Sequence, residues 1–457
     1  MSVLAPDAGV RPEVSLDASA PPGGDGSRER PFRALSEAPA HGRLRLAPGV
    51  YPGGVLLEDV ELVGGPAVVL AATPPAACVR TRGSVRLEGI QLQGGARGLV
   101  VESGRATLES VRFSGQRGPA IEVAGGAELV LSHSGLQASI SGFAGLRILP
   151  GGRAELREVR FQGPFQRAIE ATRPAALRIT GVAVQDAVTG LWLSGGTAAV
   201  EGLEVGGGRG PGLYVAGGAL QLREVRVRGH EYGLLTGEGA RVDGRGLGSV
   251  GAERSGVALV RSKAVLEDVR VESAGQMAAV QLVSSEARIR GLEVQGGSSG
   301  LSARDAQLTL EGGTIAGVRS AESIEGDAVQ IRGGRASVSG LRIQDCSGIG
   351  LLAAEAANVT LSRSTIAGAG VAGLSVETLA RLLATEVSIE RTQGPAVLVT
   401  DHGTAQLRAM TARANRDGAV WAECAQGVTV EVDGWTGDVP LAPAPCIRTV
   451  SPVTPRR

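Results

Sequence analysis

A repeat of about 22 residues runs through most of this chain and limits the folds that it can adopt. Residues 210–229, GPGLYVAGGALQLREVRVRG, contain three short runs in which apolar and polar residues alternate. Alternation with a period of two predicts β-strands that each have one apolar face. The Gly-Gly and Arg-Glu gaps between the runs leave no room for a helix. The stretch therefore predicts three short strands joined by tight corners.

The same opening, a small residue followed by an aliphatic one, recurs at intervals of 21 to 28 residues. The aliphatic positions are Leu99, Ile121, Leu146, Ile169, Leu191, Leu213, Leu234, Val257, Val280, Leu301, Val329, Leu351, Leu374, Val397 and Val420. One unit of this size cannot bury its own apolar face, but stacked units can. The repeat therefore predicts a solenoid.

Two other repeat folds have short periods, and the sequence disfavours both. Leucine-rich repeats need the pattern L-x-x-L-x-L-x-x-N, and this chain has only two asparagines, Asn358 and Asn415. The calcium-binding β-roll needs an Asp every nine residues, which is not found. Three strands per turn instead predict an all-β parallel β-helix of about sixteen or seventeen turns, near 80 Å long at about 4.8 Å per turn.

The corner between the second and third strands carries Gly in many repeats, for example Gly181 and Gly340. Glycine adopts the left-handed backbone of a sharp bend without steric cost. Other repeats have Ser110, Glu224 or Asp268 at this corner. We therefore expect that not every corner has the same conformation.

These repeats resemble the right-handed parallel β-helix (PbH1) repeats of the pectate-lyase-like superfamily, which has the pectin lyase fold. The opening segment is similar too: Asp25-Gly26-Ser27, Pro31-Phe32 and residues 44–51 follow the D-G-S…P-F…P-G-x-Y pattern of many such proteins. The resemblance covers about residues 25–438 and implies a single right-handed solenoid. It does not select a function, because the superfamily includes lyases, glycosidases, epimerases, adhesins and non-catalytic surface proteins.

The chain divides into four expected parts. They are a flexible lead-in (1–26), an N-terminal cap (27–42), the β-helix (43–438), and a C-terminal cap and tail (439–457). We predict a short helix at about residues 31–41, begun by Pro31, in which Phe32 and Leu35 cover the open end of the first coil. The long step between two repeats predicts a loop at about residues 317–327, the other place where a helix could form.

Charge and hydropathy exclude some function classes. Lys plus Arg equals Asp plus Glu, at 46 each, whereas a nucleic-acid partner would favour a basic excess. The sequence contains no run of 18 apolar residues, which a membrane span would need, and residues 1–24 contain no signal-peptide core. We favour a secreted or cell-envelope bacterial protein whose leader, or lipoprotein anchor, was removed; the alternative is a cytoplasmic assembly protein. The oligomeric state is not predicted.

The four cysteines do not have metal-ligand spacing. Cys78 and Cys346 lie in coils that are too far apart to pair within one chain. Cys424 is in the last coil and Cys446 in the tail that should fold back over it. These two residues form a disulfide or remain free thiols.

No catalytic motif is found, and no cofactor or metal is predicted. The four histidines, His41, His133, His230 and His402, are interpreted as solvent-facing turn residues. Asp401-His402 is discounted as a catalytic pair, because adjacent strand residues point to opposite sides. The acids Asp305, Asp327 and Asp345 occupy different positions of the repeat and need not converge. Trp192, Tyr214 and Trp421 are expected to face outward, where they are surface contacts or pack along the outer face.

The richest polar mixture lies in the turns that precede the first strands. We define a ledge of candidate ligand-binding residues there: Arg209, His230, Glu231, Tyr232, Glu253 and Arg254. Repeats of nearly equal length place such turns on one edge, and variable loops often carry function. The alternative is that these are solvated turn residues that pair with one another.

Two hypotheses of function follow. The first is a non-catalytic extracellular or envelope scaffold, adhesin-like, that binds a polysaccharide or a surface protein. The second, implied by the resemblance alone, is a polysaccharide lyase or glycosidase that acts on an acidic polysaccharide. Such enzymes need clustered acids, and the chain has few aromatic residues to stack on sugars.

Overall fold

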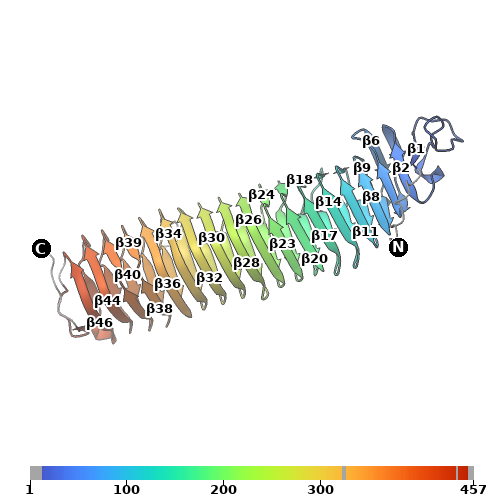
Figure 1. Cartoon of the computed structure of the whole chain (residues 1–457). Helices are drawn as coiled ribbons and strands as arrows, with labels where there is room; N and C mark the ends of the chain where they lie inside the picture. Colours follow the sequence, from blue (N-terminus) through green and yellow to red (C-terminus); the bar gives the residue numbers. More distant parts are fainter. Residues whose placement is uncertain (1–12, 322–325, 439–440, 451–457) are drawn as a thin grey trace, which may run out of the picture. The chain divides into compact units, whose positions relative to one another are not determined.

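The computed structural model describes residues 13–321, 326–438 and 441–450 of the chain. Two compact units make up the chain: unit 1 is Met1–Ala199 and unit 2 is Val200–Arg457. The described residues of each unit form an all-β, right-handed parallel β-solenoid, with about 17 turns counted over the two units (Figure 1). This confirms the fold class predicted from the repeat.

Each turn contributes strands to two parallel sheets. Sheet B contains the first strand of every turn. Sheet A contains the second and third strands, which are separate in some turns and continuous in others. Within each sheet the strand of one turn pairs in parallel with the strand of the next turn, so equivalent residues of successive repeats form columns.

In unit 1 the second and third strands of sheet A are separate and short. Sheet B of unit 1 contains β4 (Val55–Glu58), β7 (Ala77–Arg82), β10 (Arg97–Val101), β13 (Ile121–Val123), β16 (Ala144–Ile148), β19 (Arg167–Thr172) and β22 (Thr189–Ser194). The second strands are β2 (Gly42–Leu46), β5 (Val60–Val63), β8 (Ser84–Glu88), β11 (Arg105–Glu109), β14 (Glu128–Ser132), β17 (Arg153–Arg157), β20 (Ala176–Thr180) and β23 (Thr197–Glu201), which continues past Ala199. The third strands are β3 (Gly49–Pro52), β6 (Val68–Ala72), β9 (Gln91–Gly94), β12 (Arg112–Ser114), β15 (Gly135–Gln137), β18 (Arg160–Gln162) and β21 (Ala183–Gln185).

In unit 2 most turns have one continuous strand of nine or ten residues in sheet A. Sheet B of unit 2 contains β25 (Pro211–Ala216), β27 (Tyr232–Gly237), β29 (Ser255–Val260), β31 (Ala278–Val283), β33 (Ser299–Arg304), β35 (Val329–Arg332), β37 (Leu351–Ala354), β40 (Leu374–Val376), β43 (Val397–Val399) and β45 (Val420–Ala422). Its long sheet-A strands are β26 (Ala219–Arg228), β28 (Arg241–Val250), β30 (Lys263–Glu272), β32 (Glu286–Gln295), β34 (Gln307–Ala316), β36 (Arg335–Gln344), β44 (Thr404–Arg413) and β46 (Thr429–Gly437). The short strands are β24 (Glu204–Gly206), β38 (Asn358–Ser362), β39 (Thr365–Ala367), β41 (Arg381–Thr385), β42 (Ser388–Glu390) and β47 (Ile447–Thr449).

The small residue that opens each repeat has a packing reason. In both units it lies opposite an inward side chain of the third strand. A Cβ added to Gly145 would lie 2.7 Å from the Phe161 ring, and one added to Gly300 would lie 2.7 Å from Ile315 Cγ2. Atoms cannot approach so closely. The aliphatic residue that follows, such as Leu146 in unit 1, is fully buried.

The corners between the second and third strands correct one expectation. Gly181 has φ +63°, and Ser110, Glu224 and Asp268 have φ +57°, +51° and +54°. All of these corners therefore share the left-handed conformation, although we expected them to differ. A non-glycine residue in this conformation costs roughly 1–2 kcal/mol, and the parallel pairing of the strands on either side holds it in place.

The N-terminal cap is a strand, not the predicted helix. β1 (Glu13–Leu16) pairs with β2 in a segment that we expected to be flexible, and Leu16 is buried. Phe32 forms a bridge with Leu16, so its backbone is extended. Only one 3₁₀ turn, η1 (Leu35–Glu37), forms, because Pro31 and Pro39 leave too few residues for a helix to nucleate. The missed signal is the alternation in Glu13-Val14-Ser15-Leu16.

At the C-terminal end, β47 pairs with β46, and a second 3₁₀ turn, η2 (Cys424–Gln426), precedes β46. In the predicted long loop, residues 322–325 lie outside the described residues. So do residues 439–440 and 451–457 of the predicted cap and tail.

Candidate functional site

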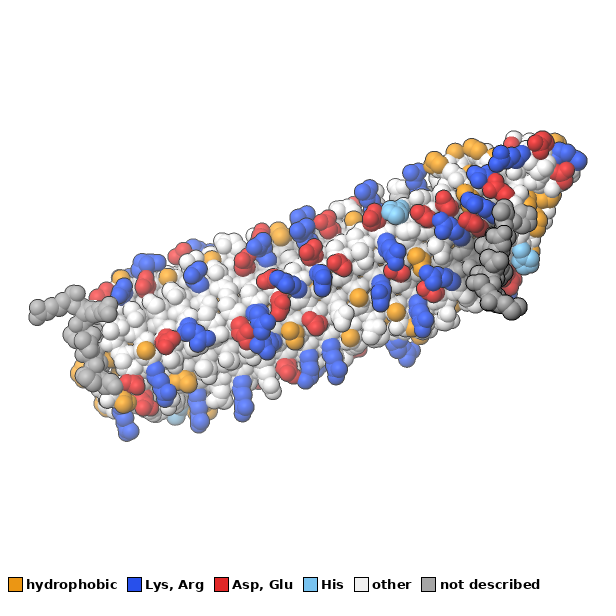
Figure 2. Space-filling view, viewed as in Figure 1, with side chains coloured by type: hydrophobic (Ala, Val, Ile, Leu, Met, Phe, Trp, Pro, Cys, Tyr) orange, Lys and Arg blue, Asp and Glu red, His pale blue; other side chains and the backbone are white. Residues whose placement is uncertain are grey.

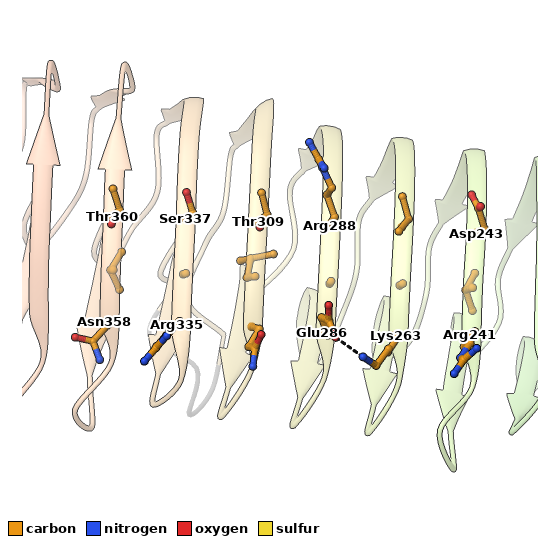
Figure 3. Close-up of a pocket in the computed structure, with 18 of the residues that line it drawn as sticks. Arg241, Asp243, Lys263, Glu286, Arg288, Thr309, Arg335, Ser337, Asn358 and Thr360 are labelled. Carbon is orange, nitrogen blue, oxygen red and sulfur yellow. Dashed lines mark hydrogen bonds and ion pairs between the residues drawn. The ribbon is translucent and has the colours of Figure 1, made fainter.

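A groove of about 1180 Å³ lies on the outer face of sheet A in unit 2. It is lined by the beginnings of the strands from β26 to β44, and two rows of side chains point outward from these strands. Figure 3 shows the part of the groove from β28 to β38. The first row is Ala219, Arg241, Lys263, Glu286, Gln307, Arg335, Asn358, Arg381 and Thr404. The second row is Gln221, Asp243, Val265, Arg288, Thr309, Ser337, Thr360, Leu383 and Gln406. We call this surface the sheet-A groove.

The sheet-A groove is positively charged although the whole chain is neutral. Its lining contains five cations but only two acids, Asp243 and Glu286. Two of the cations are already paired: Lys263 Nζ lies 2.6 Å from Glu286 Oε2, and Arg288 Nη2 lies 2.7 Å from Glu311 Oε1. An anion that enters the groove therefore meets an excess of cations.

Three groove arginines, Arg241, Arg335 and Arg381, form no ion pair within 4 Å with any residue that the structure describes, and all three are exposed. Asn358 lies between Arg335 and Arg381 in the first row, and the second-row residues of the same strands, Ser337 and Leu383, are uncharged. A guanidinium presents five donors in a planar fork that fits carboxylate or sulfate oxygens. These arginines are therefore the part of the groove best suited to bind an external anion.

A second hollow, of about 1020 Å³, lies over the later halves of the long sheet-A strands in unit 2, which correspond to the third strands of unit 1. Four arginines line it, and four acids balance them. Arg270 and Glu293, for example, form an ion pair at 2.5 Å. This hollow has no excess charge. Over the middle of the face that Figure 2 shows, cations and acids are likewise interspersed.

The structure brings together part of the predicted ledge. The Arg254 N–H donates to the Glu231 carbonyl oxygen at 2.9 Å, which stacks the two turns. Arg254 Nη1 also lies 3.1 Å from Glu231 Oε1, and its guanidinium carbon lies 5.3 Å from the centroid of the Tyr232 ring. Tyr232 is nearly buried, which raises the pKa of its hydroxyl. Arg254 thus pairs with Glu231 and lies against the Tyr232 ring, so the three residues are partners of one another.

His230 was predicted to face solvent and does not. Its side chain is 1% exposed, and Nδ1 lies 3.0 Å from the Gly210 carbonyl oxygen. Nε2 is buried and has no hydrogen-bond partner among the described residues. Burial lowers the pKa of the imidazole, so the neutral form is favoured. The residue fills the inside of a corner, a position that Ala252 occupies in the next coil.

The two remaining ledge residues, Arg209 and Glu253, are exposed. Neither forms an ion pair with a described residue. A ligand-binding role for the six ledge residues stays a prediction.

The other histidines are exposed, as predicted. His133 Nε2 lies 3.3 Å from Glu158 Oε2. Contrary to our prediction, Asp401 and His402 do not point to opposite sides of a strand. Both residues have positive φ and lie in a turn, where His402 Nδ1 is 3.2 Å from Asp401 Oδ1.

Cys424 and Cys446 form a disulfide with their Cα atoms 5.3 Å apart, which decides between the two alternatives that the sequence left open. It ties the segment before β47 to the last coil. Cys78 and Cys346 are free and buried. Burial raises the pKa of each thiol to about 11, so neither is a reactive thiolate at neutral pH.

The acids near the long loop have separate environments. Asp327 is fully buried: its Oδ1 accepts a hydrogen bond from the Ile349 N–H at 2.6 Å, and its Oδ2 accepts one from Gln330 Nε2 at 2.8 Å. Asp305 and Asp345 are exposed corner residues with positive φ. Among the described residues, no group of three His, Cys, Asp or Glu side chains could hold a metal ion.

Sheet B of unit 1 carries a charged ladder on its outer face. Arg97 lies 3.2 Å from Glu122, and Arg147 lies 4.0 Å from Glu122 and 3.1 Å from Glu170. Arg167 also contacts Glu170, at 2.5 Å, and its guanidinium carbon lies 3.8 Å from the centroid of the Trp192 ring. The charged ladder consists of Arg97, Glu122, Arg147, Arg167, Glu170 and Trp192. Trp192 thus packs along the outer face, while Trp421 in unit 2 is 56% exposed.

The sheet-A groove was not predicted from the sequence, because the candidate residues were sought in the turns before the first strands. Arg241, Arg335 and Arg381 each begin the second strand of a repeat. Aligning the repeats on that strand would have placed them in one column, but it would not have shown which cations have an acid beside them.

Comparison with known proteins gives a family model, "Right handed beta helix region", that matches residues 278–433. This agrees with the repeat class predicted from the sequence. A search of curated proteins found no match.

Several solved structures are similar over most of the chain. The catalytic unit of a thermostable GH87 α-1,3-glucanase from Streptomyces thermodiastaticus is 14% identical, with 97% of this chain and 70% of that chain covered and a TM-score of 0.26. The PL6-family alginate lyase AlyGC is 8% identical, with 93% and 100% covered and a TM-score of 0.24. Tailspike protein 3 of bacteriophage CBA120 is 11% identical, with 92% and 55% covered and a TM-score of 0.22.

Within the part of the chain that the structure describes, no helix has the length and apolar character needed to cross a membrane.

Proposed function

We propose that this protein is a non-catalytic binding protein that holds an extended anionic polysaccharide in the sheet-A groove. The observation that carries the proposal is the pair Arg335 and Arg381, two exposed cations that lack an acidic partner among the described residues. The groove around them has five cations and two acids in a chain of zero net charge. A carboxylate or sulfate group would complete their hydrogen bonds.

The shape and chemistry of the groove favour a polysaccharide over other anions. Small-molecule sites are mostly apolar and enclosed, whereas this groove extends over nine strands, and the outward side chains of its two rows are mainly Arg, Asn, Gln, Ser and Thr. A single-stranded nucleic acid would need aromatic platforms, and no aromatic residue lines the groove. Amide and hydroxyl groups that alternate with cations suit the hydroxyl and carboxylate groups of an acidic glycan.

We infer that the protein works outside the cytoplasm, in the secreted or envelope compartment. The Cys424–Cys446 disulfide supports this location, because such bonds persist in oxidising compartments. A surface polysaccharide would be accessible there.

The test is calorimetric titration of polygalacturonate and of neutral dextran into the purified protein. We expect binding of polygalacturonate alone, weakening as salt is raised. The double variant Arg335→Gln/Arg381→Gln should bind roughly tenfold more weakly, since each exposed ion pair contributes up to about 1 kcal/mol. The control is Arg413→Gln, an exposed arginine outside the groove lining.

Equal binding by the double variant and the wild type would reject the groove as the site. Shortening of the polymer during the titration, measured by size-exclusion chromatography, would reject the non-catalytic part of the proposal.

A further inference from the structure

The cations of the sheet-A groove have a spacing that identifies the charge pattern of the polymer. Along the first row the side chains follow one another in register, one per coil. Lys263 and Glu286 neutralise each other at 2.6 Å. The cations that remain are Arg241, Arg335 and Arg381.

These three arginines are separated by even numbers of coils. Arg241 and Arg335 lie four coils apart, and Arg335 and Arg381 lie two coils apart. At about 4.8 Å per coil, the last two are roughly 10 Å apart. The uncompensated positive charge therefore recurs at multiples of two coils.

The positions between and after the cations are uncharged and can form hydrogen bonds. Asn358 lies between Arg335 and Arg381, and Thr404 follows Arg381. In the second row, the residues opposite this part of the groove are Ser337, Thr360, Leu383 and Gln406, which are also uncharged. From Arg335 onward the first row thus reads cation, amide, cation, hydroxyl.

An extended glycan whose rings are joined through equatorial bonds advances by about one sugar ring per coil of this solenoid. We propose that the groove recognises a polysaccharide in which one anionic sugar alternates with one uncharged sugar, and this rests on the proposed function. The anionic groups lie at Arg335 and Arg381, and the uncharged sugars donate to and accept from Asn358 and Thr404.

A polymer that is charged at every sugar fits this pattern less well. Half of its anionic groups lie away from the arginines, beside Asn358, Thr404 or the second row. There they lose water without gaining a cation. Such a polymer binds through net charge but more weakly than the alternating one.

The test compares three octasaccharides by calorimetry at one salt concentration. The probes are a hyaluronan octasaccharide, in which glucuronate alternates with N-acetylglucosamine, a β-1,4-linked oligomannuronate that is charged at every ring, and a neutral cello-oligosaccharide; all three are joined through equatorial bonds. We expect the alternating probe to bind at least tenfold more tightly than the oligomannuronate, and the neutral probe not to bind.

A matched pair of variants tests the spacing. Asn358→Arg adds the missing cation, and should bring the affinity for the oligomannuronate to within about twofold of that for the alternating probe. The control Thr365→Arg adds the same charge to an exposed residue of the same coil that lies outside the groove lining, and should leave the ratio of affinities unchanged. Thermal melting of each variant confirms that it is folded.

The outcomes separate the two proposals. Equal affinity of the wild type for both acidic probes, or a preference for the oligomannuronate, overturns the alternating pattern and leaves the proposed function standing. Failure of both acidic probes to bind overturns the proposed function itself.

Discussion

The charged ladder of unit 1 and the sheet-A groove of unit 2 are built on the same fold, but the charges of the ladder are paired and three arginines of the groove are not paired with any described residue. In the ladder, Arg147 lies between two acids, Glu122 and Glu170, whose side chains are only 15% and 16% exposed. In the groove, Arg335 and Arg381 are exposed and have no acid within 4 Å among the described residues. Both surfaces consist of outward residues stacked in columns by parallel pairing.

The difference teaches that a column of arginines in a β-helix is not in itself a binding site. In unit 1 the neighbouring coils supply the counter-charge, so the arginines stabilise the solenoid's own surface. In unit 2 the neighbouring coils supply Asn358 and Thr404 instead, so the counter-charge must come from outside. The partner of each cation, rather than the number of cations, distinguishes a structural surface from a candidate site.

Both surfaces are defined by the residues that face outward, and the largest expected change in stability tests which residues these are. Leu222 is buried in the core of unit 2, and Arg223 beside it is exposed. Leu222→Asp should lower the free energy of unfolding by about 4 kcal/mol or more, because it buries a charge among aliphatic side chains. Arg223→Asp should change it by less than about 1 kcal/mol. Urea denaturation measures both, and similar losses would mean that the two faces are reversed.

The second prediction concerns the pH dependence of stability, which should differ between the units because His230 of unit 2 is buried and His133 of unit 1 is exposed. Neutral His230 is favoured in folded unit 2, because burial lowers its pKa below the usual value of about 6.5. Above pH 6.5 the residue is neutral in both the folded and unfolded states, and its contribution to stability is complete. As the pH falls below 6.5 the unfolded state binds the proton more readily, so stability decreases.

The control for this prediction is His230→Gln. Glutamine already occupies the equivalent corner of unit 1, where Gln116 is 9% exposed and its Nε2 donates to the Leu92 carbonyl oxygen at 2.9 Å. The variant should lose less stability than the wild type between pH 7.5 and pH 5. Hydrogen exchange at pH 5 should show loosening around His230 in unit 2, and not around the exposed His133 in unit 1. An identical pH response of variant and wild type would contradict the assignment.

The smallest expected effect compares the two kinds of arginine directly. Arg147→Gln should cost about 1 kcal/mol of stability, because it leaves Glu122 and Glu170 with one cation fewer. Arg381→Gln should cost close to nothing, since no ion pair is lost. Polymer binding should respond in the opposite order, with only Arg381→Gln weakening it. If Arg381→Gln destabilises the protein as much as Arg147→Gln, the distinction between the two surfaces is lost.

Much of the fold could be predicted because the repeat has a fixed register. The aliphatic residues that begin the first strands, such as Val257 and Val280, pair with one another as the spacing indicates. The misses arose where local pattern and tertiary context disagree. Phe32 pairs with Leu16 rather than beginning a helix, and Glu224 adopts the same left-handed corner as glycine because the pairing of its neighbours holds it there.

The candidate site was less predictable, for physical reasons. The predicted ledge combined Glu231 and Arg254, which neutralise each other, with His230, which is buried. Variable turns can be recognised in a sequence. Whether a charged side chain has an oppositely charged partner, however, depends on which residues the neighbouring coils place beside it. Arg335 and Arg381 begin two strands that have nothing unusual in their own sequences.

The most direct test of the central claim is a crystal structure of the protein with the bound alternating octasaccharide. The account predicts electron density for the sugar along the outer face of sheet A in unit 2, over β36, β38 and β41. One carboxylate should lie beside Arg335 and the next beside Arg381, with an uncharged ring beside Asn358 between them. Sugar density over the charged ladder of unit 1, at the ledge, or in the second hollow around Arg270 would contradict it.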